Sequence, residues 1–468
     1  MSTIIQEAKF TCALGAQQSV LGIPGAVPVI HAGPGCSQRQ FSYLSVGSGY
    51  QGEGYTGGGQ IPCTNSSQSE VVFGGEKKLA KLLDATYKVM KGDLYVVLSG
   101  CTAGIVGDDV KQVTYDHSTK EHPTVGVDTS GFRGNNYKGH NIVIEGIIDQ
   151  LLEEAQPNVR KGLVNVFSVV PFQDPYWRGD LEEIKRILEG LGLEVNILFG
   201  YGSKGVSEWY DIPNAELNIV LSPWVGLGAA KLCERRFGTP YLHNPVLPVG
   251  LKDTSAFLRK VAETLSLDRE KTEDFIKSEE RRYKQYFVSM GDVLSDYAPY
   301  LPYDLYLIDD SAYGLGTARF CTNELGMIPQ AFFDIDVPPA TAKELIQASL
   351  EEIDEAWKDK LIDEPDNAII RKAVEQRIAI RQTKSLIFGS SWDKDLAERT
   401  DNILIFHSAP ITDNVILNKT YVGYNGGLNL MQDIYSGVFN RKKVSNLTHG
   451  ETERERNTYG TAKTGGSN

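Results

Sequence analysis

The sequence predicts an α/β fold in which parallel sheets are flanked by helices. Short apolar runs alternate along the whole chain with amphipathic stretches, as is typical of strands that are joined by crossover helices. With 468 residues the chain is too long for one hydrophobic core and has the length of about three domains. We therefore expect three Rossmann-like domains, over residues 1–160, 161–300 and 301–440, followed by a flexible tail over 441–468.

The first third contains a clear helix and strand. Residues 77–90 carry leucines on one face at helical spacing, which predicts a helix, and the apolar run 94–98 predicts the strand that follows it. Cys101 comes just after this strand. Because open α/β sheets bind their ligands beyond the carboxyl ends of the strands, we expect a cofactor ligand at Cys101.

The middle and last thirds repeat the alternation, with a charged helical region over 255–293 that contains a break near Asp268. From residue 440 onward almost no apolar residues occur, which predicts a loose tail. We find no repeat strong enough to indicate internal duplication. The patterns predict strands at 164–170, 194–199, 217–221, 305–308, 332–333, 386–388 and 403–406, and helices at 181–191, 225–236 and 341–357.

The composition is that of an ordinary globular protein, with 41% hydrophobic and 23% charged residues. A net charge of −13 argues against nucleic acid or an anionic membrane as the main partner. The amino terminus lacks the basic start and apolar run of a secretory signal, and no stretch approaches the ~18–20 apolar residues of a membrane helix. We therefore expect a cytoplasmic protein that binds neither nucleic acid nor membranes.

Three of the six cysteines stand in turns of small residues and predict an iron–sulfur site. Cys12 lies in Thr-Cys-Ala-Leu-Gly-Ala, Cys36 in Gly-Pro-Gly-Cys and Cys101 in Ser-Gly-Cys-Thr-Ala-Gly. Glycine or alanine beside the sulfur lets the backbone approach a bulky inorganic core. The alternative, in which all three are buried thiols without a ligand, fits this set of contexts less well.

Three thiolates do not complete the ligands of a four-iron cluster. Either a fourth ligand comes from elsewhere in the chain, or a second subunit contributes thiolates at a shared interface, and we favour the interface. Six cysteines are too sparse in so long a chain for a disulfide scaffold.

The motifs around these cysteines, in this order and near this spacing, resemble those of the nitrogenase component 1 family. The resemblance covers roughly residues 8–436 and is specific only as a set. It is carried by Phe10-Thr11-Cys12, Gly15-Ala16, His31, Gly35-Cys36, Val72-Phe73-Gly74-Gly75, Cys101, Ile105-Val106-Gly107-Asp108-Asp109, Gly131-Phe132-Arg133-Gly134, Leu217–Leu221 and Tyr421-Val422-Gly423-Tyr424-Asn425-Gly426-Gly427.

The resemblance implies a β-type subunit of an oxidoreductase complex. Residues matching Cys12, Cys36 and Cys101 bind a cluster of P-cluster type in that subunit, either [8Fe-7S] or [4Fe-4S], and an α-type subunit supplies the remaining thiolates. The expected assembly is an α2β2 heterotetramer. A separate ATP-hydrolysing iron–sulfur reductase delivers the electrons, in keeping with the lack of a Walker A motif in this chain.

The chain departs from the family pattern beside the predicted cluster. Alignment on Phe132 places Gly131 where the β-type subunit often has a serine, and Ser130 lies one place away. Cys63 matches no family ligand that we can place, so it is either a buried thiol or an added ligand. Cys233 and Cys321 lie in predicted helices and are expected to pack in the core.

Other motifs favour structural roles. The α-type subunit binds its cofactor through a cysteine and a histidine, but Ser222 replaces the cysteine here, and His407 is expected to be a hydrogen-bonded residue at a strand end. The glycine-rich stretch 200–205 lacks the acidic residue of a dinucleotide site. Asp108 and Asp109 are expected at a helix amino terminus, where the helix dipole favours negative charge.

The resemblance does not specify the substrate. A mixture of α-type and β-type features indicates a divergent branch, for which we prefer a methylthio-alkane reductase that cleaves carbon–sulfur bonds, with dinitrogen reduction next. The competing class is a scaffold on which the nitrogenase cofactor is assembled. A tetrapyrrole reductase of the same superfamily fits the long carboxyl-terminal third less well.

Overall fold

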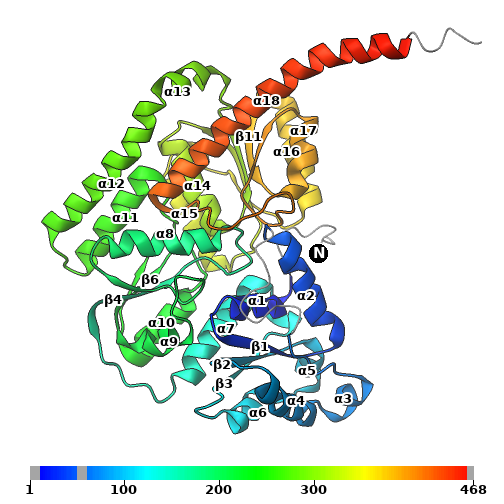
Figure 1. Cartoon of the computed structure of the whole chain (residues 1–468), viewed down its shortest axis with the longest axis vertical. Helices are drawn as coiled ribbons and strands as arrows, with labels where there is room; N and C mark the ends of the chain where they lie inside the picture. The colour runs from blue at the N-terminus through cyan, green and yellow to red at the C-terminus, as the bar shows by residue number, and fades with distance from the viewer. Residues whose placement is uncertain (1–10, 50–60, 461–468) are drawn as a thin grey trace, which may run out of the picture.

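A computed structural model describes residues 11–49 and 61–460 of the chain. Three parallel sheets lie one after another along the sequence, and helices flank them (Figure 1). All strand pairs within these sheets are parallel. The predicted α/β class is therefore confirmed.

The first sheet has three strands in the order β1-β2-β3. Pro28 lies inside β1 and cannot donate a hydrogen bond to a neighbour, which is tolerated because β1 is an edge strand of this sheet. The elements are β1 (Ala26–His31), β2 (Leu94–Ser99), β3 (Thr124–Asp128), α1 (Gln17–Leu21), α2 (Pro34–Gly47), α3 (Gln68–Phe73), α4 (Glu76–Val89), α5 (Cys101–Val106), α6 (Val110–His117) and α7 (Asn136–Leu151).

The second sheet has four strands in the order β5-β4-β6-β7. Asp268 accepts hydrogen bonds from the amides of Glu270 and Lys271 and so begins a new helix at the predicted break. The elements are β4 (Arg160–Phe167), β5 (Glu194–Asn196), β6 (Ala215–Val220), β7 (Tyr241–His243), α8 (Trp177–Glu189), α9 (Val206–Asp211), α10 (Leu227–Phe237), α11 (Gly250–Thr264), α12 (Arg269–Ser289) and α13 (Gly291–Tyr297).

The third sheet has five strands in the order β10-β9-β8-β11-β12. The predicted helix 341–357 ends at Glu351, and a separate 3-10 turn follows at Glu355–Trp357. The elements are β8 (Asp304–Asp309), β9 (Ile328–Asp334), β10 (Leu361–Asp363), β11 (Ser385–Gly389), β12 (Ile403–Phe406), α14 (Ser311–Asn323), α15 (Ala340–Glu351), α16 (Asn367–Arg381), α17 (Lys394–Arg399) and α18 (Gly423–Gly460).

The first two sheets share one hydrophobic core. Leu98 of the first sheet and Val166 of the second belong to the same buried cluster as Trp177 of α8. The third sheet is packed by two further clusters. The predicted domain bounds at residues 160 and 300 therefore separate sheets, while the division into independent domains stays a prediction.

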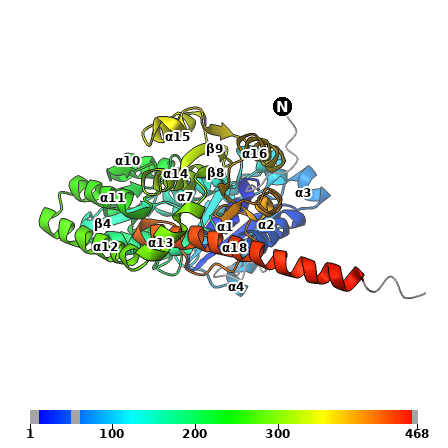
Figure 2. The ribbon, with the colours of Figure 1, turned by 90° about the horizontal axis from the view of Figure 1, so that it is seen from above.

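The last helix starts within the body of the molecule and ends outside it. The beginning of α18 packs against α8, α11, α12 and β12. Its carboxyl-terminal half points away from the rest of the chain in both views (Figures 1 and 2). The described backbone is thus helical up to Gly460, in the segment where we expected a flexible tail, and residues 461–468 lie outside the described part.

None of the described helices combines the length and the apolar composition that crossing a lipid bilayer requires.

Candidate functional site

The site lies at the carboxyl ends of the first sheet, where the three strands end at one level. His31 of β1 pairs with Ser99 of β2, and Ser99 pairs with Asp128 of β3. The chain then continues from these ends to Cys36, Cys101 and Gly131 respectively. Parallel strands therefore bring together three turns that are far apart in the sequence.

Cys12 reaches the same edge from outside the sheet. It forms a bridge with Asn135, and the amide of Ala13 donates to the carbonyl of Gly134 at 2.8 Å. The amide of Asn136 donates to the carbonyl of Thr11 at 3.0 Å. The backbone on both sides of Cys12 is thus tied to the segment that follows Gly131.

Gly131 lies against both Cys12 and Cys101. Its backbone N–H donates to Cys101 Sγ at 3.2 Å. A Cβ atom at position 131 would lie 3.0 Å from Cys101 Sγ and 3.4 Å from the Cβ of Cys12. The two cysteines therefore stand on the same side of a residue that has no side chain.

Cys36 completes the group from the first turn of α2. Its side chain reaches the surface, yet the surrounding protein removes part of its water and raises the pKa of its thiol. Negative charge on Cys12, Cys101 and Cys63 raises this pKa further. The thiols are therefore close enough to interact electrostatically, and the structure brings Cys12, Cys36 and Cys101 to one edge as the sequence predicts.

The donor set fits an iron–sulfur cluster. Thiolates are the usual ligands of such clusters, and each binds its own iron atom. Within the described residues, no three His, Cys, Asp or Glu side chains converge closely enough to hold a single metal ion. Cys12 and Cys101 both lie beside the side-chain-free position 131, and both affect the pKa of the Cys36 thiol. The role of the three thiols as cluster ligands stays a proposal.

Cys63 lies beside this group and is held by the backbone. Its Sγ donates to the carbonyl of Ala32 at 3.5 Å and accepts from the amide of Asn65 at 3.4 Å. Burial raises the pKa of this thiol. These contacts fit a structural thiol, and a role as an added ligand stays the alternative prediction.

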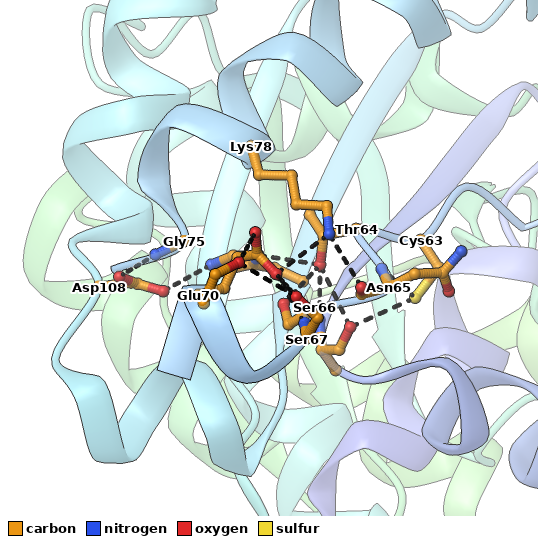
Figure 3. Close-up of polar contacts among 12 residues, drawn as sticks. Cys63, Thr64, Asn65, Ser66, Ser67, Glu70, Gly75, Lys78 and Asp108 are labelled. Atoms are coloured by element: carbon orange, nitrogen blue, oxygen red, sulfur yellow. Dashed lines mark hydrogen bonds and ion pairs between the residues drawn. The ribbon is translucent and has the colours of Figure 1, made fainter. Parts of the chain in front are cut away.

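A buried histidine links the cysteine-bearing turns. His31 Nε2 lies 2.9 Å from Asp108 Oδ2, and its Nδ1 lies 3.2 Å from the hydroxyl of Thr64. Asp108 also accepts from the amide of Gly75 at 2.8 Å, as Figure 3 shows. Burial lowers the pKa of His31 more than the neighbouring Asp108 raises it.

The sequence did not indicate this link. Asp109 has the expected role, because it accepts from the amide of Gln112 at 3.0 Å at the start of α6. Asp108 instead binds a histidine 77 positions earlier in the chain. No local pattern connects the two residues, so only the folded chain reveals the pair.

An apolar surface flanks the cysteines. Val72 and Phe73 of α3 are 69% and 87% exposed, and Ile105 of α5, which packs beside α3, is 69% exposed. Phe132, next to Gly131, is 70% exposed. Exposed apolar groups of this kind mark interaction surfaces. We call Val72, Phe73, Ile105 and Phe132 the apolar rim.

Polar contacts hold α3 at the surface. Glu70 and Ser67 form a capping box at its amino terminus. Lys78 binds Glu70 at 3.1 Å and the carbonyl of Asn65 at 3.0 Å, and Figure 3 shows these contacts around Ser66 and Ser67. The capping box and the contacts of Lys78 therefore stabilise α3 at the surface, where it exposes its apolar side chains.

A second group of polar residues lies inside the molecule, around Ser222. Ser222 accepts from the amide of Val225 at 3.1 Å, and Asp336 accepts from the indole of Trp224 at 2.9 Å. Ser222 and Asp336 line a cavity of about 10 Å³. A space of this size holds about one water molecule.

His407 belongs to the same interior region and is fully engaged. Its Nδ1 forms a buried hydrogen bond with Asp309, and its Nε2 lies 3.3 Å from the hydroxyl of Thr317. The interpretation as a hydrogen-bonded strand-end residue is confirmed. We call Ser222, Asp309, Asp336 and His407 the interior polar cluster.

The remaining cysteines, Cys233 and Cys321, are fully buried, as expected of packing residues. Burial raises the pKa of Cys233 to about 12. Within the described residues, which include all six cysteines, no disulfide is present.

Comparison with known proteins gives one family. The model of the family described as "Nitrogenase component 1 type Oxidoreductase" matches residues 11–439. The chain is 26% identical over 280 residues to the nitrogenase vanadium-iron protein beta chain of Trichormus variabilis, covering 54% of this chain and 57% of that one. It is 28% identical over 295 residues to the nitrogenase molybdenum-iron protein alpha chain of Methanosarcina barkeri, covering 58% and 51%. These two matches span about half of each relative.

A third relative matches over almost its whole length. The nitrogenase molybdenum-iron protein beta chain of Methanococcus maripaludis is 24% identical over 474 residues, which cover 92% of this chain and 93% of that one. Among solved structures, "Nitrogenase Cp1 at pH 6.5" superimposes with a TM-score of 0.76 at 19% identity and covers 94% of both chains. The structural similarity shows that the fold is shared.

Proposed function

Because the chain belongs to the nitrogenase component 1 type oxidoreductase family, we propose that it is the β-type subunit of a nitrogenase-like reductase complex. In this proposal it holds an iron–sulfur cluster at the contact with an α-type subunit. The cluster passes electrons from an ATP-dependent reductase to the cofactor of the α-type subunit.

The observation that carries the proposal is the convergence of Cys12, Cys36 and Cys101 on the edge of the first sheet. Gly131 leaves room between two of them and donates a hydrogen bond to Cys101. The three thiolates would bind iron atoms of the cluster, which supplies one-electron transfer when it is present. The polypeptide around them positions the sulfur atoms and limits the access of water.

The β type is supported by the interior of the molecule. Ser222 stands where the α-type chain has its cofactor cysteine, and its cavity of about 10 Å³ has no room for a metal cofactor. Both ring nitrogens of His407 already contact side chains of this chain, those of Asp309 and Thr317. The match over 93% of a nitrogenase beta chain points the same way. The substrate-reducing cofactor therefore belongs to the partner.

The surface around the cysteines suits contact with other chains. Three thiolates are too few for the cluster, and Cys36 is exposed, so that thiolates of an α-type subunit can complete the ligand set. The apolar rim lies at the same edge and fits a docking surface for the partner or the reductase. The complex would be an α2β2 heterotetramer. A cytoplasmic location is part of the proposal.

The proposal extends to the substrate of the complex. Methylthio-alkanes, whose carbon–sulfur bond would be cleaved, are our first choice, and dinitrogen is the second. The cluster itself is either [8Fe-7S] or [4Fe-4S].

A scaffold for assembly of the nitrogenase cofactor is the alternative function. The observation that favours it is Gly131, because a position without a side chain offers no oxygen ligand that could exchange during turnover. Steady reduction of a substrate by the complex with ATP and reductase would favour the enzyme. Release of a metal cluster to an apoprotein would favour the scaffold.

The ligand assignment is tested by Cys101→Ala in the complex purified with its α-type partner. We expect loss of cluster iron and of reductase activity while the far-ultraviolet circular dichroism stays unchanged. Cys321→Ala is the matched control, because this thiol is buried elsewhere and its loss should leave the iron in place. Full iron content in the Cys101 variant would contradict the assignment.

A further inference from the structure

We infer that Gly131 tunes the reduction potential of the cluster through its backbone N–H, and that its missing side chain is what makes this possible. The inference rests on the proposed function, because it requires that Cys101 is a cluster ligand. It assigns to Gly131 a positioning role rather than a catalytic one. Three observations carry it: the hydrogen bond, the lack of space and the rigidity of the turn.

The hydrogen bond is direct. The amide of Gly131 donates to Cys101 Sγ at 3.2 Å, across 30 residues of sequence. Hydrogen bonds to the sulfur atoms are among the factors that set the potential of an iron–sulfur cluster. A donor stabilises the thiolate most when the cluster carries its extra electron, since charge-assisted hydrogen bonds are the stronger ones. This N–H therefore raises the reduction potential.

Space rather than backbone conformation explains the glycine. Gly131 is not among the glycines with positive φ, so its backbone conformation would accept an L-residue. An added Cβ, however, would lie 3.0 Å from Cys101 Sγ and 3.4 Å from the Cβ of Cys12. Any side chain here would push Cys101 away from the amide that binds it.

The turn that carries the amide is fixed on both sides. The amide of Ser130 donates to Asp128 Oδ1 at 3.0 Å, and the amide of Arg133 donates to the carbonyl of Ser130 at 2.9 Å. Thr129 donates its hydroxyl to the carbonyl of Ser99 at 2.9 Å. The donor is thus held in place before any cluster binds, and it cannot follow Cys101 if the sulfur moves.

A pair of alanine variants tests the role of Gly131. Gly131→Ala crowds Cys101, and we expect it to lower the midpoint potential of the cluster in a redox titration of the purified complex. Gly35→Ala is the matched control, because Gly35 also adjoins a predicted ligand, Cys36, yet an added Cβ there meets nothing within 4 Å. The control should keep the potential of the unmodified complex.

A third variant covers the case in which Gly131→Ala does not fold. Gly104→Ala would place a Cβ 3.1 Å from the Cβ of Ser130 and would press on the turn without touching a cysteine. Gly104 lies within α5, where alanine is favourable. We expect a smaller shift in the same direction as that of Gly131→Ala.

The outcomes separate this inference from the proposed function. A lower potential in the Gly131 and Gly104 variants, or loss of iron from a folded Gly131 variant while the Gly35 variant retains it, supports the inference. Equal potentials in all variants, or an equal shift in the Gly35 variant, overturn it. An unmodified complex without iron at these cysteines overturns the proposed function itself.

Discussion

Two groups of side chains lie near the carboxyl ends of strands in this molecule. They differ in their exposure and in the hydrogen bonds that they form within the chain. At the edge of the first sheet, Cys36 is exposed, and Cys12 and Cys101 flank a position without a side chain. In the interior polar cluster, Ser222, Asp336 and His407 are buried and bonded to other residues of the chain.

The difference shows how a binding site can be told from a structural cluster in the same fold. The buried polar groups of the interior cluster are bonded within the chain, and the cavity of about 10 Å³ beside them has room for about one water molecule. The cysteine edge is partly open to the surface at Cys36 and lies beside exposed apolar side chains. Removal of one side chain should therefore have opposite consequences in the two regions.

The largest effect is expected at the cysteine edge, from Cys36→Ala. The variant should lose the cluster iron, because the set of thiolates is broken, while the free energy of unfolding of the chain without metal should stay within about 0.5 kcal/mol, as for an exposed residue. Iron analysis of the complex and denaturant unfolding of the isolated chain measure the two quantities. Iron retained at the level of the unmodified complex would break the comparison.

His407→Ala should give the reverse result. Loss of the imidazole removes the buried hydrogen bond to Asp309, and the free energy of unfolding should fall by about 1–3 kcal/mol. The iron content of the complex should not change. An unchanged denaturation midpoint, or iron lost in proportion to this substitution, would show that His407 is not merely structural.

The two regions should also respond oppositely to acid. His140, which binds Ser19 of α1 behind Cys12, has its pKa lowered by burial from 6.5 to about 3. As the pH falls below 6.5, His140 therefore binds a proton in the unfolded chain but not in the folded chain. This group lowers the free energy of unfolding by up to about 1.4 kcal/mol per pH unit in that range.

Asp180 lies near the interior polar cluster, and its effect on the pH dependence of stability has the opposite sign to that of His140. Burial raises its pKa from 3.8 to about 6 although Tyr313, Thr420 and Tyr421 donate hydrogen bonds to it. The folded chain therefore gains a proton before the unfolded chain does, and stability rises as the pH falls from 6 to 3.8. Denaturant unfolding between pH 7 and pH 4 should show a shallower acid loss for His140→Gln and a steeper one for Asp180→Asn. Parallel curves for both variants and the unmodified chain would contradict the two assignments.

The smallest effect on the chain itself is expected from Phe73→Ala in the apolar rim. Phe73 is 87% exposed, so its removal should leave both iron content and stability unchanged. If the rim is a docking surface, reductase-dependent turnover at limiting reductase should fall about tenfold. A tenfold change corresponds to about 1.4 kcal/mol of binding free energy, as for the loss of one contributing contact residue. Lys88→Ala, on an exposed face of α4, serves as the control.

Much of the fold was predictable because its signals are local. The helix predicted over 77–90 appears as Glu76–Val89, and the strand over 94–98 appears as Leu94–Ser99. The helix has clear periodicity and the strand is an uninterrupted apolar run, so neighbouring residues are sufficient to specify both. The strands Ala26–His31 and Thr124–Asp128 were not predicted, since Pro28 and Gly126 interrupt runs that are short in any case.

The candidate site was predictable only in part. The small-residue turns drew attention to three cysteines that the fold brings to one edge, but not to the bond from Gly131 to Cys101 or to the pairing of His31 with Asp108. These partners lie 30 and 77 positions apart, and no periodic pattern spans such separations. Beside the predicted cluster, Gly131 stands where the family resemblance implies a serine, and its surroundings leave no room for a side chain.

Residue types and short-range spacing were thus sufficient for the α/β class, for many of the helices and strands and for the choice of candidate thiols, because each of these depends on neighbours in the chain. Which thiols meet, which carboxylates are occupied by other side chains and how much space remains depend on the packing of distant segments. That packing distinguishes an open edge with three thiols from a filled interior around Ser222, and it became visible only in the folded chain.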